Sequence, residues 1–331
     1  MENNTIILSI AIPTYNRKDM LKECIEKILT QNNGLIEIVI SDNGSNDGTS
    51  QLCEDFVNKY PFIRYYRNEK NEGFDFNYRN CIKFSTGKYV LVLSDDDLIS
   101  DNFISNFFEL INKKEYDLIA LNLKGFELDS KSIDEYDGQN FRFGLGEDEI
   151  YTKKEEKNFF ERLSYWFTLV SMFVMKREKI SNISDSIFEK YNGTWFMNVA
   201  HNMACISNGE EYVLSKKCFL NIRTMNYAHY NIYEVFFKKF KFVLYNCSSD
   251  FGIKKKNLKI CYRKLLKEHM RFFEYEIRIG LICSFKTKPK FRYIFKTLAF
   301  KESWIYYLPV VFCPKFILKH HYRKRTKRKK E

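Results

Sequence analysis

The chain has 331 residues, of which 45% are hydrophobic and 17% aromatic, a composition that excludes an intrinsically disordered protein and allows one large or two smaller folded domains. Its nine cysteines are odd in number and form no Cys-x-x-Cys pair, which argues against a zinc ribbon and a disulfide framework and predicts reduced thiols in a cytosolic setting. The formal net charge of +12 is concentrated in residues 225–331, where 27 lysines and arginines face 7 acidic residues, so that end of the chain is expected to seek an anionic surface.

The first 125 residues alternate strand-like and helix-like segments. Apolar runs predict strands at residues 6–12, 36–40, 62–66, 89–93 and 118–122. Amphipathic segments predict helices at residues 19–30, 49–60, 75–85 and 102–112. Asp75 is expected to cap the third of these helices. Strands separated by helices at this spacing predict a parallel sheet with crossover helices, as in a Rossmann-like domain.

The remaining chain is less regular. Residues 126–158 are expected to form a variable loop or insertion, residues 167–175 a strand and residues 194–206 a short helix. Two short strands are expected to pair as a small sheet, at residues 212–214 and 219–223. Lysine- and aromatic-rich helical segments begin near Tyr227. We therefore expect one domain over residues 1–225, with halves at 1–125 and 126–225, followed by a basic, largely helical region over 226–331.

Three consecutive aspartates, Asp95, Asp96 and Asp97, follow the apolar run at residues 89–93. Charged groups are costly inside a buried strand and fit best at its end, where open α/β sheets bind their ligands. Clustered carboxylates there predict a hard divalent cation shared with substrate phosphates. The alternative is an acidic turn that caps the helix beginning near Asn102.

Three other polar motifs follow strands of the same expected sheet. They are the segments Pro13-Thr14-Tyr15-Asn16-Arg17, Ser41-Asp42-Asn43-Gly44-Ser45-Asn46-Asp47-Gly48-Thr49 and Asn68-Glu69-Lys70-Asn71-Glu72-Gly73. Because the carboxyl ends of parallel strands share one edge of the sheet, these motifs are expected to line one pocket with the aspartates. Tyr15 offers a ring for a nucleobase, and Asp42 offers an acceptor for a base N–H group.

The four motifs, in this order, resemble those of the family 2 glycosyltransferases, and the resemblance covers residues 6–125. The pattern is closest to the abequosyl- and other O-antigen sugar transferases of bacteria. The resemblance implies the GT-A fold, an α/β fold with a mainly parallel sheet and helices on both faces. The residues that it implies for nucleotide-sugar binding are Pro13, Thr14, Tyr15, Asn16, Arg17, Asp42, Asn71, Arg79 and Asp95.

The resemblance also implies a Mg²⁺ or Mn²⁺ cofactor held by Asp95, Asp96 and Asp97, with Asp96 in a catalytic role. Ser94 stands where many relatives carry the first aspartate of the metal motif, so the choice of the directly bonded aspartate stays open. Arg79 is expected either to reach the diphosphate or to face solvent from its helix.

The position of the general base departs from the family pattern. Many relatives carry Gly-Glu-Asp at the mouth of a helix, where this chain has Gly193-Thr194-Trp195. His201 is a candidate because its ordinary pKa lies near neutrality, and its alternative role is a histidine satisfied within the fold or lining the acceptor cleft. Asp185 and Glu189 are further candidates. An acceptor that is already an anionic lipid phosphate would need no base.

The expected function is an enzyme that moves a sugar from a nucleotide-diphosphate donor to a lipid-linked glycan, with inversion of the anomeric centre, in bacterial lipopolysaccharide or capsule synthesis. One alternative is a polyprenyl-phosphate glycosyltransferase. A different class of alternative is a non-catalytic sugar- or nucleic-acid-binding protein. Nucleic acid is not expected as a partner, because residues 1–224 are net acidic and no nucleic-acid-binding signature occurs.

The C-terminal end combines an apolar segment with a basic one. Residues 304–318 are rich in aromatic and aliphatic side chains but are interrupted by Pro309, Pro314 and Lys315, so they are not expected to span a bilayer. Residues 319–330 then hold eight lysines and arginines in twelve positions. This pattern is typical of an interfacial anchor and predicts a cytoplasmic enzyme, peripheral on the inner face of the cell membrane. The alternative is a core helix followed by a solvated tail.

Overall fold

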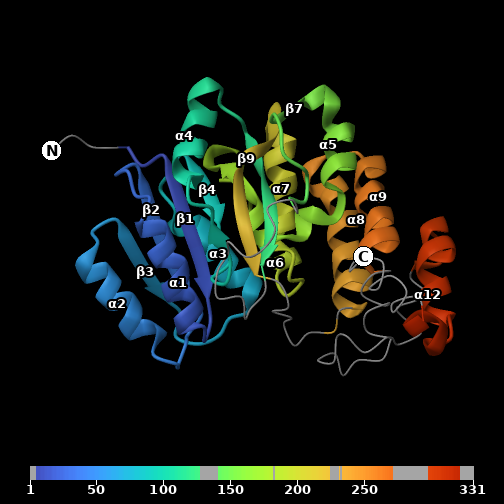
Figure 1. Ribbon diagram of the computed structural model, residues 1–331, viewed down its shortest axis with the longest axis horizontal. Helices are drawn as coiled ribbons and strands as arrows, with labels where there is room; N and C mark the ends of the chain where they lie inside the picture. Colours follow the sequence, from blue (N-terminus) through green and yellow to red (C-terminus); the bar gives the residue numbers. More distant parts are fainter. Residues whose placement is uncertain are drawn as a thin grey trace. The chain divides into compact units, whose positions relative to one another are not determined.

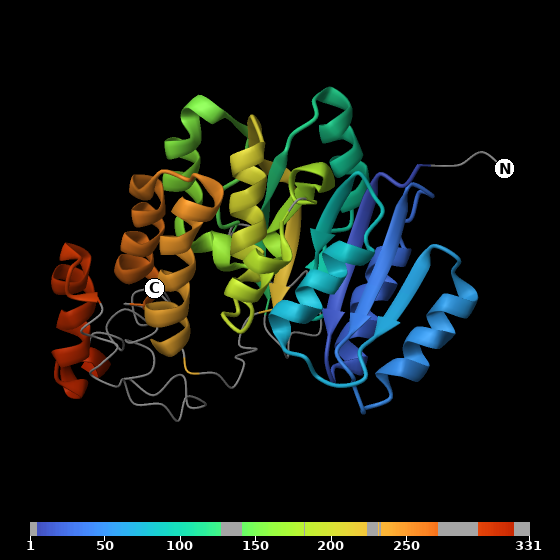
Figure 2. The same cartoon turned by 180° about the vertical axis from the view of Figure 1, so that it is seen from behind.

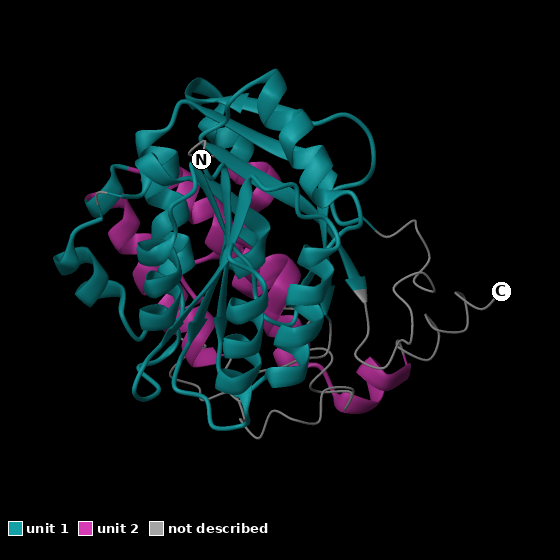
Figure 3. Ribbon diagram, turned by 90° about the vertical axis from the view of Figure 1, so that its left-hand side faces the viewer, with its two compact units in different colours: residues 1–159, 166–226, 250–252 teal, residues 160–165, 227–249, 253–331 magenta. Residues whose placement is uncertain are grey.

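The computed structural model describes residues 5–126, 141–181, 183–223, 231, 233–270 and 297–320. The chain divides into two compact units, coloured separately in Figure 3: residues 1–159, 166–226 and 250–252 form the first, and residues 160–165, 227–249 and 253–331 the second. The domain boundary expected at 225/226 and most of the polybasic run, from residue 321 onward, lie outside the described residues. Both stay predictions.

The first unit is built on one mixed sheet of nine strands (Figure 1). The strands are β1 (Leu8–Thr14), β2 (Ile36–Asp42), β3 (Ile63–Arg67), β4 (Tyr89–Val92), β5 (Leu98–Ile99), β6 (Leu118–Phe126), β7 (Glu149–Thr152), β8 (Phe173–Lys176) and β9 (Glu211–Arg223). Their order is β3-β2-β1-β4-β8-β6-β9-β5, with β7 paired to β9. Strands β1 to β4 are mutually parallel, so their carboxyl ends meet at one edge.

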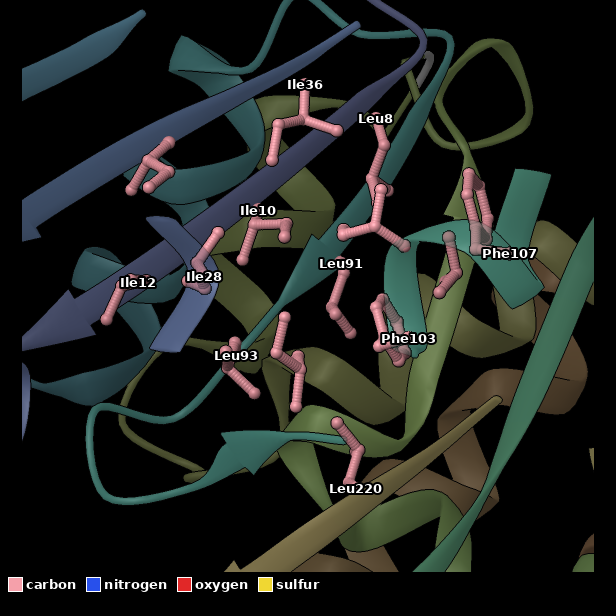
Figure 4. Packing of buried hydrophobic residues seen from close by; sticks show 14 of the residues in the cluster. Leu8, Ile10, Ile12, Ile28, Ile36, Leu91, Leu93, Phe103, Phe107 and Leu220 are labelled. Atoms are coloured by element: carbon pink, nitrogen blue, oxygen red, sulfur yellow. The ribbon is translucent and has the colours of Figure 1, made fainter. Parts of the chain in front are cut away.

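Helices cover both faces of this sheet, as Figures 1 and 2 show from opposite sides. The helices of the first unit's sheet are α1 (Lys18–Leu29), α2 (Thr49–Lys59), α3 (Phe74–Phe84), α4 (Phe103–Lys113), α6 (Asp185–Tyr191) and α7 (Met197–Asn208). Successive side chains of β1 point to opposite faces of the sheet, so alternate residues pack against the helices on one face. Leu8, Ile10 and Ile12 pack into a core with α1 and α4, which is drawn in Figure 4.

The other face of β1 and β2 is covered by α3, which in turn packs against α7. Asn77 of α3 reaches the sheet edge: its Nδ2 donates to the backbone carbonyl of Ser41 at 2.9 Å, and its Oδ1 accepts from the Ser41 hydroxyl at 2.7 Å. The first turn of α3 is thereby fixed at the carboxyl ends of β1 and β2. The predicted alternation of strands and helices over the first 125 residues is confirmed, and so is an α/β fold with helices on both faces of the sheet.

Three local predictions are wrong. The segments expected as two paired short strands, residues 212–214 and 219–223, form one long strand, β9, which runs parallel to β6 with a register shift after Leu121. The strand expected over residues 167–175 is shortened to β8, because 3-10 turns occupy Ser164–Thr168 and Val170–Met172. The loop or insertion expected over residues 126–158 is not contradicted, and its described part contains β7 and the start of α5 (Glu156–Leu163). Asp75 does not cap its own helix, which begins after Gly73 without a side-chain cap. In each case a partner distant in the sequence decides the local structure.

The second unit is helical in its described part. Its elements include α8 (Lys241–Phe251), α9 (Lys255–Lys264) and α12 (Leu308–Phe312), with π-helical turns at Glu234–Phe240, Leu265–Met270 and Ser303–Tyr307. The ion pair between Arg263 and Glu302, at 2.7 Å, joins α9 to the residues before α12. Among the described residues, no helix has both the length and the apolar character that a bilayer crossing requires.

Candidate active site

The loops that follow β1 and β2 are tied together by hydrogen bonds. The backbone N–H of Asn16 donates to the Ser45 hydroxyl at 2.8 Å, and the N–H of Asn46 donates to the Asn16 side-chain oxygen at 2.8 Å. Asn16 adopts a left-handed φ of 53°, a conformation that asparagine tolerates better than most residues. Tyr15 stays 42% exposed beside these contacts. The two loops therefore form one rigid rim with an aromatic ring on its surface.

Asp42 lies at the end of β2 and is fully buried. Its Oδ1 accepts from the N–H of Ser45 at 2.9 Å, and its Oδ2 accepts from the Tyr65 hydroxyl at 2.8 Å, with Arg67 Nε 3.5 Å away. Burial and the bond to this carboxylate raise the pKa of Tyr65, so its hydroxyl remains a donor. Asp42 thus holds the loop after its own strand, and its role toward a nucleobase stays a prediction.

Asn71 joins the loop after β2 to the loop after β3. Its Oδ1 accepts from Asn43 Nδ2 at 2.8 Å and from the N–H of Gly73 at 2.9 Å. Gly44 lies beside this junction with a φ of 77°, and a Cβ there would stand 2.9 Å from the backbone of Lys70. Only glycine fits this position without a shift of the neighbouring chain.

Arg79 does not point freely into solvent from α3. Its guanidinium pairs with Asp185 and stacks over the ring of Phe188 at 4.1 Å. Both partners belong to α6, so Arg79 holds that helix against α3. Asp185, which the sequence analysis named as a candidate base, is the acidic partner of this ion pair.

Asp95 and Asp96 converge on one cationic side chain. Arg17 Nη1 lies 2.9 Å from Oδ1 of Asp95 and 3.1 Å from Oδ2 of Asp96. Thr14, which with Pro13 closes β1, donates its hydroxyl to the second oxygen of Asp95 at 2.8 Å. The motif after β1 and the aspartates after β4, far apart in the sequence, therefore meet at the shared edge of the sheet.

Asp97 turns to different partners. The hydroxyl of Ser171 donates to its Oδ2 at 2.6 Å, and the backbone N–H of Arg223 donates to its Oδ1 at 3.1 Å. The guanidinium of Arg223 also donates from Nε to the backbone carbonyl of Asp96 at 3.0 Å and pairs with Glu23 at 2.6 Å. The end of β9 thus fastens the aspartate loop through Asp96 and Asp97.

Burial makes the carboxylates of Asp95 and Asp97 hard to ionise. It raises the pKa of Asp95 to about 6, against the opposing effect of Arg17, and it raises the pKa of Asp97 to about 8 with help from the charge of Asp96. Burial opposes the charge of Arg17, but the two neighbouring carboxylates outweigh it and raise the pKa of Arg17. A site of this kind attracts positive charge.

The residues fit a divalent cation as a pair, not as a triad. Within the described part of the chain, no three acidic, histidine or cysteine side chains are grouped to hold a metal, and Asp97 faces Ser171 and Arg223 instead. Asp95 and Asp96 do converge on a single positive charge. One or two carboxylates are what Mg²⁺ takes from a protein when substrate phosphates supply further oxygens. The assignment of a metal to Asp95, Asp96 and Asp97 stays a prediction, and the convergence of Asp95 and Asp96 on one positive charge is the observation that supports part of it.

His201 lies inside the fold. Only 4% of it is exposed, its Nδ1 is 2.9 Å from the backbone carbonyl of Met197 in its own helix, and its ring meets Tyr78 edge-on. Burial lowers its pKa to about 4. This position favours the alternative role of a histidine satisfied within the fold. Glu189 lies on the exposed side of α6, so no acid or histidine named from the sequence as a base adjoins the aspartates through a described contact.

Sequence reasoning missed Ser171 and Glu23, and it assigned Asp75 a different role from the one that the structure shows. Ser171 holds Asp97, Glu23 holds Arg223, and Asp75 accepts from the backbone N–H groups of Trp195 and Met197 at 2.8 and 3.0 Å. Each pair is separated by more than seventy positions in the sequence. Isolated serines and acids carry no local pattern, so only the fold reveals them.

The second unit exposes apolar side chains near its C-terminal end. The exposed large side chains of this segment are Trp304, Ile305, Phe312, Phe316 and Ile317. Lys301, Lys315 and Lys319 are exposed in the same stretch. Apolar and basic groups thus share residues 301–319.

Comparison with known proteins places this site in a family. Residues 9–184 match the family model described as glycosyl transferase family 2. Glycosyltransferase GlyG of Streptococcus pneumoniae is 24% identical over 282 residues, which cover 81% of this chain and 89% of that protein. Abequosyltransferase RfbV of Salmonella typhimurium is 38% identical over 103 residues, 30% of this chain and 31% of its own length.

The fold has solved counterparts. The structure of Staphylococcus aureus TarS residues 1–349 in complex with UDP-GlcNAc superposes with a TM-score of 0.62 at 17% identity, over 88% of this chain and 79% of that one. At this identity the likeness concerns the fold. It extends beyond the strands and helices of the first unit, because it covers most of the chain.

Proposed function

Because the chain belongs to glycosyl transferase family 2 and is a glycosyltransferase, we propose that it transfers a sugar from a nucleotide-diphosphate donor to a lipid-linked glycan in the synthesis of a bacterial surface polysaccharide. The single observation that carries this proposal is the meeting of Arg17, Asp95 and Asp96 at the carboxyl edge of the parallel strands. Open α/β sheets bind their ligands at this edge.

The nucleotide would lie over the rim formed by the loops after β1, β2 and β3. Tyr15 supplies an exposed ring for the base, and Arg17 supplies a positive charge for the diphosphate once substrate phosphates compete with Asp95 and Asp96 for it. Asp42 and Asn71 keep the rim rigid through their bonds to Ser45 and Asn43. The complex of TarS with UDP-GlcNAc supports a uridine nucleotide as the first donor to examine.

A Mg²⁺ or Mn²⁺ ion would be held by Asp95 and Asp96. When bound, it neutralises the diphosphate and so improves the leaving group. The protein's own contribution is to position that charge: Thr14 and Ser94 fix one oxygen of Asp95 and one of Asp96 at 2.8 and 2.6 Å. Arg223 holds the loop through the carbonyl of Asp96 and the carboxylate of Asp97.

The acceptor hydroxyl would attack the anomeric carbon from the side opposite the diphosphate, with inversion. His201 is a poor candidate for taking its proton, since burial lowers its pKa to about 4 and its Nδ1 is engaged within α7. A lipid-phosphate acceptor, which needs no base, is therefore the second candidate function. The burial of His201 is the observation that favours it.

The enzyme would work at the cytoplasmic face of the cell membrane, where lipid-linked acceptors are found. The exposed Trp304, Phe312 and Phe316, together with nearby lysines, support attachment to an anionic lipid surface. The polybasic residues that follow add charge, each worth on the order of 1 kcal/mol near an anionic leaflet.

The experiment that tests the proposal is isothermal titration of UDP, GDP, CDP and dTDP into the protein, each with and without Mn²⁺. We expect one nucleotide to bind more tightly with the metal, and we expect Asp96→Asn to remove the metal effect. Asp101→Asn is the matched control, because Asp101 is an exposed aspartate four positions beyond Asp97 that pairs with Lys27. Binding of none of the four nucleotides by the folded protein would overturn the proposal.

A further inference from the structure

Two aromatic residues of the first unit are exposed within its described part: Tyr15 and Trp195, each 42% accessible. Tyr15 follows β1 at the carboxyl edge of the sheet. Trp195 lies in the turn between α6 and α7, far away in the sequence. Single exposed apolar side chains are common on soluble proteins, so Trp195 is informative only because the fold enforces its position and sets a second ring beside it.

The position of Trp195 is enforced. Its φ is 73°, a left-handed conformation that a bulky residue rarely adopts. Asp75, which is 2% exposed, accepts from the N–H of Trp195 at 2.8 Å and from the N–H of Met197 at 3.0 Å, and so fixes the backbone on both sides of the intervening residue. A buried carboxylate from α3 therefore holds the tryptophan in a strained backbone conformation.

The ring of Trp195 lies beside that of Phe74. The two centroids are 6.3 Å apart and the planes differ by 15°. This separation is in the range of offset stacking, in which each ring leaves part of its face uncovered by the other. Trp195 is 42% exposed and Phe74 is partly exposed, and we name this pair of nearly parallel rings the Trp195–Phe74 platform.

The platform belongs to the same edge of the sheet as the aspartates. Phe74 and Asn77 are three positions apart in the first turn of α3, and residues at this spacing share one face of a helix. Asn77 Nδ2 donates to the backbone carbonyl of Ser41 at 2.9 Å and approaches that of Thr14 at 3.4 Å. The hydroxyl of the same Thr14 donates to Asp95.

We propose that the Trp195–Phe74 platform binds the face of a pyranose ring at the candidate active site. A pyranose presents several C–H bonds on one side, and these pack against the electron-rich face of an aromatic ring, while its hydroxyls remain available to polar groups. The inference rests on the proposed glycosyl transfer, which requires a sugar on each side of the reacting bond. The pyranose can belong to the acceptor or to the donor.

Tryptophan fluorescence tests the platform directly. The chain has three tryptophans, Trp166, Trp195 and Trp304, so a Trp304→Phe variant removes the exposed tryptophan of the second unit. This protein is titrated with the methyl glycosides of glucose, galactose, mannose and N-acetylglucosamine, and separately with UDP and UDP-sugars. We expect a saturable emission change with at least one sugar-containing ligand and none with UDP alone.

Two substitutions assign the change to the platform. Trp195→Gly removes the ring and suits the left-handed backbone, so the protein stays folded, and we expect the affinity for the sugar to fall about tenfold. Trp195→Phe keeps an aromatic face and should retain most of the affinity. A response to methyl glycosides assigns the platform to the acceptor, and a response only to UDP-sugars assigns it to the donor.

The contrary outcomes are distinct. No emission change with any sugar, or a change and affinity that persist in Trp195→Gly, overturns the platform. Nucleotide binding measured by calorimetry on the same proteins separates this failure from failure of the glycosyl-transfer proposal. If the protein binds a nucleotide but shows no response to sugars, the platform alone is refuted. If it responds to a methyl glycoside but binds no nucleotide, the platform is supported and the proposal of a nucleotide-diphosphate donor is refuted.

Discussion

The guanidinium of Arg17 lies 2.9 Å from the carboxylate of Asp95, across the edge of the sheet between β1 and β4. The same nitrogen is 3.1 Å from Asp96. Arg17 is thus the counter-charge for two carboxylates that a divalent cation would also need. Cation binding and release of Arg17 toward the substrate diphosphate are linked in the proposed reaction.

Removing the positive charge of Arg17 should make the thermal stability of the protein depend more strongly on Mn²⁺. In Arg17→Gln, Asp95 and Asp96 lose their shared cation and repel each other, so Mn²⁺ should raise the thermal unfolding temperature by more than it does in the wild type. Differential scanning fluorimetry with and without MnCl₂ measures this. Lys27→Gln, which removes an ion pair with the exposed Asp101, is the control. Equal Mn²⁺ shifts in all three proteins would contradict the link.

Asp96 should be essential for turnover. Asp96→Ala removes one of the two carboxylates assigned to the cation and is expected to lower kcat by about 10²–10³-fold, the scale for losing one transition-state electrostatic contact. Transfer from the nucleotide sugar identified by titration provides the assay. Asp101→Ala should keep near-wild-type activity. Similar turnover in Asp96→Ala and the wild type would refute the metal assignment.

His201 should affect stability in acid. Its folded-state pKa is about 4 against an ordinary value of 6.5, so between these pH values the unfolded chain binds more protons than the folded one. The neutral ring therefore stabilises the folded state relative to a charged one above about pH 6.5. This part of the free energy of unfolding, about 3 kcal/mol in total, is lost as the pH falls toward 4.

Urea unfolding at pH 7 and pH 4.5 checks this expectation. His201→Gln should lose less stability than the wild type between the two values, and His320→Gln, at an exposed position, should behave as the wild type. The same variant separates the two roles considered for this residue. A loss of kcat by several orders of magnitude with normal stability would restore His201 as the general base.

Asp75 should contribute stability through a helix that is not its own. Asp75→Ala leaves the backbone N–H groups of Trp195 and Met197 without this acceptor, at a cost of about 1–3 kcal/mol. Chemical denaturation measures the difference. Asp19→Ala is the matched control, since Asp19 also lies in the first turn of a helix but is exposed. A loss no larger than that of the control would mean that the bonds to α7 are unimportant.

Membrane attachment should need both the apolar and the basic parts of the C-terminal end. Deletion of residues 319–331 is expected to move the protein from the pellet to the supernatant when it is sedimented with phosphatidylglycerol vesicles at moderate salt. Replacing the exposed Trp304, Phe312 and Phe316 with serine should weaken the binding that remains at high salt. The triple replacement Val57, Leu145 and Ile150 to serine, at exposed positions of the first unit, is the control. Unchanged sedimentation of the deletion variant would remove the anchor hypothesis.

The sequence by itself determined the strands and helices of residues 6–125 and the convergence of their polar motifs. The reason is local: apolar periodicity sets each element, and parallel strands bring their carboxyl ends to one edge, so the motifs that hold Arg17 and Asp95 were expected to line the same pocket. Asp95, Asp96 and Asp97 could be selected as site candidates from the sequence because they directly follow the apolar run at residues 89–93.

Only the tertiary structure decided which partners those residues have. Asp97 bonds to Ser171, Arg79 pairs with Asp185, Asp75 caps α7, and the two expected short strands merge into β9. Each depends on contacts between distant segments, which no local pattern encodes. Burial is collective in the same way: the low pKa of His201 arises from the packing of all its neighbours and not from any residue beside it in the sequence.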